Sequence, residues 1–115
     1  MTEISLKFDF ANGHRLGPGK ADLLAQVRAH GSIAAAGRAM GMSYRRAWLL
    51  VDQMNHMFVE PVVMTQLGGR GGGSAQLTPF GETVLNRYRA LQAKTAMAVA
   101  ADLAALEAAL RAPER

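Results

Sequence analysis

The chain has 115 residues, half of them hydrophobic, which is enough for one domain with a single core and excludes a disordered chain. It contains no cysteine, which excludes disulfides, cysteine nucleophiles and thiolate metal sites. No apolar run approaches the roughly 18 residues that span a bilayer. The first ten residues also lack the apolar block of a signal peptide. We therefore expect a cytoplasmic protein with no membrane partner.

The net charge of +4 is unevenly distributed along the chain. Residues 11–46 hold six basic side chains and a single acidic one, Asp22. A localised basic excess is typical of proteins with a polyanionic partner such as nucleic acid, although solubility alone would also explain it.

The N-terminal segment predicts a β-hairpin. Apolar side chains at every second position indicate a half-buried strand over residues 4–10. Asn12 and Gly13 suit a tight turn, and a short return strand is expected near His14–Leu16.

Two helices are expected next, over about residues 20–30 and 33–40. Gly31 is well placed to end the first helix, and Ser32 to cap the second by accepting a backbone N–H bond. The second helix is rich in alanine, and such small side chains allow two helix backbones to approach closely.

A third helix is expected from a cap at Ser43 to about Phe58. Side chains spaced by three or four are predicted to face inward: Tyr44, Ala47, Trp48, Val51, Met54 and Phe58. The opposite side of this helix would carry Arg45, Arg46, Leu49, Asp52, Gln53 and His56. Packing on one face would thus leave the arginine face free.

The C-terminal half predicts a second hairpin and one long helix. Residues 62–67 and 74–78 read as paired strands around the glycine-rich turn 68–73. Thr78 followed by Pro79 is a favourable helix start, and the helix should continue to Leu110. Its later part carries a seam suited to another helix, formed by Ala96, Val99, Leu103, Leu106 and Leu110.

This order of elements predicts a mostly α fold with small β-hairpins (α+β), a winged helix-turn-helix with a long C-terminal dimerisation helix. Residues 1–115 would form a single domain. Its parts would be a three-helix core (19–58), a wing (61–78) and the long helix (79–111).

The predicted third helix has the width that a DNA major groove admits, and two arginines in its first turn can reach a phosphate or a guanine edge. A glycine-rich hairpin tip with one arginine can lie along the backbone or in a minor groove. The candidate DNA-binding residues are Ser32, Ser43, Tyr44, Arg45, Arg46, Gln53 and Arg70. Tyr44 and Trp48 are expected in the core rather than stacked on bases, although the Tyr44 hydroxyl could still reach a phosphate. The alternative for the two arginines is a role as solvated surface charges.

The segments "GSIAAAGRAMGMSYRRAWLLVDQMN" and "GGRGGGSAQLTPFGE" together resemble the N-terminal DNA-binding domain of the ModE-type molybdate-responsive transcriptional regulators. A weaker likeness is to the LysR-type regulators. The resemblance implies a homodimer, held by the first strand and the last helix, on a pseudo-palindromic operator. Full-length members continue into molybdate-binding domains, whereas this sequence ends at Arg115. Molybdate sensing is therefore not carried over.

The residues do not favour an enzyme. The glycine-rich turn lacks the lysine of a phosphate-binding loop and the glycine spacing of a dinucleotide fingerprint. The three histidines, at positions 14, 30 and 56, have no paired spacing, so neither a metal site nor a cofactor is expected.

The sequence thus predicts a non-enzymatic, sequence-specific regulator that binds double-stranded DNA as a homodimer. Two alternatives stay open. One is a winged helix that binds an acidic protein surface, and the other is a stand-alone sensor of molybdate or a similar oxyanion.

Overall fold

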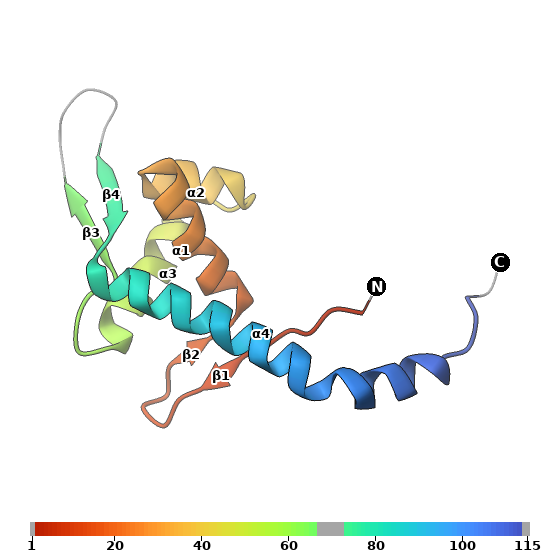
Figure 1. Cartoon of the computed structure of the whole chain (residues 1–115). Helices are drawn as coiled ribbons and strands as arrows, with labels where there is room; N and C mark the ends of the chain where they lie inside the picture. Colours follow the sequence, from red (N-terminus) through yellow and green to blue (C-terminus); the bar gives the residue numbers. More distant parts are fainter. Residues whose placement is uncertain (1, 67–72, 114–115) are drawn as a thin grey trace.

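A computed structural model describes residues 2–66 and 73–113 (Figure 1). The described chain contains four helices and two separate two-stranded antiparallel sheets, an α+β architecture. The helices are α1 (Pro18–His30), α2 (Ile33–Ala39), α3 (Tyr44–Met57) and α4 (Pro79–Ala108). The first sheet pairs β1 (Phe8–Asp9) with β2 (Arg15–Leu16), and the second pairs β3 (Val63–Gln66) with β4 (Ser74–Leu77).

The first hairpin is shorter than predicted. A strand over residues 4–10 was expected, but β1 has two residues, because a strand extends only as far as its partner can hydrogen-bond. The partner β2 is cut short by α1, which begins at Pro18. Ahead of β1, the carbonyl of Leu6 accepts a hydrogen bond from the Tyr88 hydroxyl on α4.

Hydroxyl caps begin three of the helices, as the sequence predicts. A side-chain oxygen accepts the backbone N–H three residues ahead, which satisfies a donor that the first turn leaves free. The pairs are Ser32 with Ala35 (3.0 Å), Ser43 with Arg46 (3.1 Å) and Thr78 with Gly81 (2.8 Å). These positions fix the starts of α2, α3 and α4.

Helix α1 lies at the centre of the packing and contacts α2, α3, α4 and β4. Its inward side chains are fully buried, namely Ala21, Leu23, Leu24 and Val27. Against them pack Met54 of α3 and Leu85 and Tyr88 of α4. The C-terminal half of α4 extends away from this body (Figure 1). Along it the predicted seam is exposed at Ala96 and Leu106 and half-buried at Val99 and Leu103, while Leu110 is exposed just beyond the end of the helix. The homodimer therefore stays a prediction.

Helices α2 and α3 meet through their smallest residues. A Cβ atom on Gly37 would lie only 3.0 Å from the Cβ of Ala47, and both residues are buried. The expected close approach of two helix backbones is therefore confirmed, and it fixes where α2 crosses α3.

The inward orientation predicted for Tyr44 and Trp48 is wrong, because these side chains are 59% and 48% exposed. The buried face of α3 consists of Ala47, Val51, Met54 and Met57. With α2 crossing α3 at Ala47, no helix of the described chain covers Tyr44 and Trp48 fully. The predicted α+β class is confirmed by the four helices and two small sheets.

Candidate ligand-binding site

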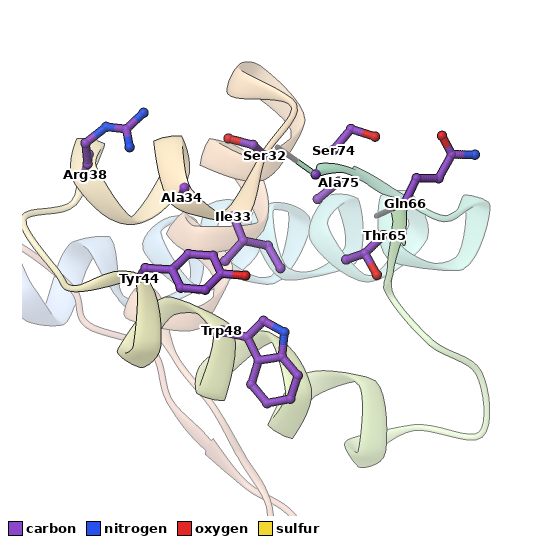
Figure 2. A pocket seen from close by; sticks show the side chains of 11 residues that line it. Ser32, Ile33, Ala34, Arg38, Tyr44, Trp48, Thr65, Gln66, Ser74 and Ala75 are labelled. Atoms are coloured by element: carbon purple, nitrogen blue, oxygen red, sulfur yellow. The ribbon is translucent and has the colours of Figure 1, made fainter. Parts of the chain in front are cut away.

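A cavity of about 430 Å³ opens between α2, α3 and the second hairpin. Figure 2 shows the side chains that line it. They are Ser32, Ile33, Ala34 and Arg38 from α2 and its cap, Tyr44 and Trp48 from α3, and Thr65, Gln66, Gly73, Ser74 and Ala75 from β3, β4 and the residue before β4. The volume falls within the roughly 300–1,000 Å³ of small-molecule pockets.

Hydrogen bonds fix the strands of the second hairpin beside the helices at this cavity. The N–H of Ala75 on β4 donates over 2.8 Å to the carbonyl of Gly31, the C-cap of α1 that directly precedes the cap of α2. Strand β3 is tied to α3 by Asn55, whose Oδ1 accepts from the N–H groups of Val62 and Val63 at 2.8 and 3.0 Å. The cavity is thus built on paired and capped elements.

The lining is rich in hydrogen-bond donors and carries positive charge. Arg38 supplies a guanidinium, and hydroxyl groups come from Ser32, Tyr44, Thr65 and Ser74. None of the described lining residues is acidic. The arginine ion pairs of residues 2–66 and 73–113 are Arg15–Asp9, Arg28–Glu82 and Arg89–Asp22, so none of them involves Arg38. Such a donor set suits an anion, which only accepts hydrogen bonds.

The structure brings together only part of the predicted site. Ser32 and Tyr44 line the cavity, whereas Ser43, Arg45, Arg46 and Gln53 do not. The two arginines and Ser43 are exposed, and Gln53 is half-buried. Arg45 borders a separate shallow depression together with Tyr44 and Trp48. Arg70 lies outside the described residues.

Sequence reasoning did not select four of the polar lining residues, Arg38, Thr65, Gln66 and Ser74. Arg38 is the single basic residue of α2, and its lack of acidic neighbours in sequence was the available signal. Thr65, Gln66 and Ser74 could not be selected from the sequence, because they come together only when β3 pairs with β4.

A second cavity, of about 350 Å³, lies between the first hairpin and α4. Its walls are almost entirely apolar and include Phe8, Phe10, Phe58, Phe80 and Tyr88. Such walls offer an anion few hydrogen-bond donors.

Within the described chain, no cluster of His, Asp or Glu could hold a metal ion. No helix there is both long and apolar enough to cross a membrane.

The chain is similar in sequence to several known proteins. It is 44% identical over 84 residues to the molybdenum-pterin-binding protein MopB of Rhodobacter capsulatus, covering 73% of this chain and 31% of that protein. It is 34% identical over 111 residues to MopA, a molybdenum-pterin-binding protein of the same organism, covering 96% and 40%. It is also 34% identical, over 71 residues, to the DNA-binding transcriptional dual regulator ModE of Escherichia coli, covering 62% and 27%. No family model matches.

The chain therefore spans well under half the length of these relatives. The two Mop proteins, which match over longer segments than the regulator does, are named for binding molybdenum-pterin. On these two matches the interpretation of the chain as a DNA-binding domain is corrected. The predictions of a duplex-DNA partner, an operator and a LysR-like, winged helix-turn-helix regulator are accordingly wrong. All three names are those of binding or regulatory proteins, not of enzymes.

Proposed function

We propose that this chain binds a molybdate-type oxyanion in the cavity between α2, α3 and the second hairpin. The observation that carries the proposal is the donor set: one guanidinium and four hydroxyls around a cavity whose described lining residues include no acidic side chain. The relatives named for molybdenum support the choice of anion. The prediction that molybdate sensing is not carried over is thereby reversed.

We also propose that the chain is a binding protein without enzymatic activity. Its cytoplasmic location stays a prediction.

The residues present fit a tetrahedral oxyanion. Ser32 Oγ accepts the Ala35 N–H as a helix cap, which leaves its hydroxyl proton free to donate. Arg38 and the hydroxyl of Tyr44 reach the cavity from neighbouring helices, and Thr65 and Ser74 lie on its hairpin side (Figure 2). A molybdate dianion would thus receive charge-assisted hydrogen bonds from the guanidinium and neutral ones from the hydroxyls.

Calorimetric titration of the protein with sodium molybdate tests this proposal. We expect a saturable heat of binding in the wild type. Arg38→Gln should weaken binding about tenfold or more, because a hydrogen bond to a charged group is worth about 1.5–3 kcal/mol. Arg46→Gln is the matched control, since Arg46 is also an exposed arginine but does not line the cavity. No heat at millimolar molybdate, or an equal effect of both variants, would refute the site.

A further inference from the structure

The second cavity, between the first hairpin and α4, is lined by a continuous series of aromatic rings. The centroids of neighbouring rings lie 5.5–6.3 Å apart along the series, which runs Tyr88, Phe8, Phe10, Phe58 and Phe80. The series begins and ends on α4, about two helical turns apart. The rings and the helix thus surround a space of about 350 Å³, which is the size of a small-molecule pocket.

These rings are not sealed from solvent within the described chain. Phe8, Phe58 and Phe80 are only half-buried, and Phe10 and Leu91 of the same lining are 37% and 42% exposed. A contiguous exposed apolar surface of this kind marks a binding site. The part of a ligand that enters must itself be apolar, because a polar group would give up its hydrogen bonds to water without replacement.

Arg87 adds a positive charge beside this apolar space. It is exposed and lines the cavity, and none of the described lining residues is acidic. Within residues 2–66 and 73–113, Asp9, Asp22 and Glu82 pair with other arginines, and no ion pair involves Arg87. A guanidinium at the solvent-facing side of an apolar cavity suits a carboxylate at the end of an apolar body.

The ring angles indicate the shape of that apolar body. Phe8 and Tyr88 meet at 89°, Phe10 and Phe58 at 68°, and Phe58 and Phe80 at 74°. Walls at such steep angles do not form two parallel faces that could enclose a flat ring system. A flexible alkyl chain can bend to follow them and gains stability from the apolar area that it buries.

We propose that this second cavity binds an aliphatic monocarboxylate of medium chain length, with the chain among the aromatic rings and the carboxylate paired with Arg87. The cavity shares no lining residue with the one assigned to molybdate. The proposal therefore goes beyond the oxyanion site and does not depend on it.

Calorimetry with four probes tests the chain and the charge separately. Decanoate, below its micelle concentration, should bind at least about ten times more tightly than hexanoate, because each buried methylene strengthens binding about fourfold. Decanoate should also bind more tightly than decyltrimethylammonium, which has the same chain and the opposite charge, and more tightly than the flat acid 2-naphthoate.

Variants at two exposed positions of α4 place the ligand. Arg87→Gln should weaken decanoate about fivefold, a modest loss because water partly screens an exposed pair, and should leave molybdate binding unchanged. Arg46→Gln is the matched control, since Arg46 is an exposed arginine outside this cavity. Leu91→Gln should weaken decanoate about threefold, whereas Leu91→Met keeps the apolar surface and most of the affinity.

Equal affinities for decanoate and hexanoate, or tighter binding of 2-naphthoate than of decanoate, would overturn the proposal from the wild type alone, whatever the variants do. Equal effects of Arg87→Gln and Arg46→Gln would overturn the assigned carboxylate partner. Decanoate binding that weakens as the protein concentration rises would show that a second copy of the chain fills the cavity, which also overturns it. Molybdate binding without decanoate binding would refute this proposal and leave the oxyanion site intact.

Discussion

Gly81, in the first turn of α4, packs directly against the backbone of Val62, and a Cβ atom at position 81 would overlap the Val62 carbonyl oxygen. The same carbonyl accepts the N–H of Thr78 at 3.0 Å, and the Thr78 hydroxyl donates to the carbonyl of Pro61 at 2.8 Å. These contacts fix the start of α4 to residues 61 and 62, which lead directly into β3 at the cavity.

Gly81→Ala is expected to destabilise the protein by about 1–3 kcal/mol or more, because the added methyl group must displace backbone rather than a flexible side chain. Gly19→Ala is the matched control. Gly19 lies in α1, and a methyl group added there would have no neighbour within 4 Å, so alanine should stabilise the helix by about 0.5–1 kcal/mol. Urea unfolding of the two variants measures the difference, and effects of the same sign would contradict the packing.

Asn55→Ala should cost about 1–3 kcal/mol of unfolding free energy, because it leaves the N–H groups of Val62 and Val63 without their acceptor. The Asn55 amide also donates to the Val63 carbonyl at 3.2 Å. Asn86→Ala, at an exposed position of α4, should change stability by less than about 0.5 kcal/mol. Chemical denaturation of both variants is the measurement, and similar small losses would show that Asn55 does not hold β3 to α3.

Tyr88 makes stability depend on alkaline pH. Burial, reinforced by the nearby Asp22 carboxylate, raises the pKa of Tyr88 above its ordinary value of 10.0. Below pH 10 both folded and unfolded chains keep the phenol proton; above it the unfolded chain loses the proton first, so stability falls as pH rises through the folded pKa.

Tyr88→Phe should therefore cost about 1 kcal/mol at pH 8, by loss of the hydrogen bond to Leu6, and this cost should shrink between pH 10 and 11. Unfolding free energies across pH 8–11 test it. Tyr44→Phe, at the exposed tyrosine, is the control. A cost that is constant over the whole range would argue against a coupled proton.

Ser32→Asp tests the role of Ser32 in ligand binding separately from its role as a helix cap. Aspartate also caps helices well, so stability should stay within about 0.5 kcal/mol of the wild type. Its carboxylate would face the bound anion, and repulsion should lower the affinity for molybdate at least about tenfold. Ser43→Asp changes the cap of α3 in the same way but lies outside the cavity lining, so molybdate binding should be kept. If calorimetry gives both variants the same affinity for molybdate, Ser32 does not contribute to the binding site.

Much of the fold followed from local chemistry. The caps at Ser32, Ser43 and Thr78 were predictable because each hydroxyl satisfies an N–H three residues away, whatever the rest of the chain does. The candidate site was less predictable. Ser32 and Tyr44 were named, but for a different partner, and Arg38 was not selected. The comparisons with the two Mop proteins, rather than the fold, replaced DNA by molybdenum as the expected ligand.

By itself, the sequence determined where helices begin and which turns separate them, because these depend on neighbours within one or two turns. Tertiary structure alone decided that Tyr44 and Trp48 face a cavity. Their helical spacing is compatible with a core, but the contact of Gly37 with Ala47 places α2 so that neither ring is covered. Periodicity defines a face of a helix, whereas the element that packs on that face is set by contacts between residues distant in sequence.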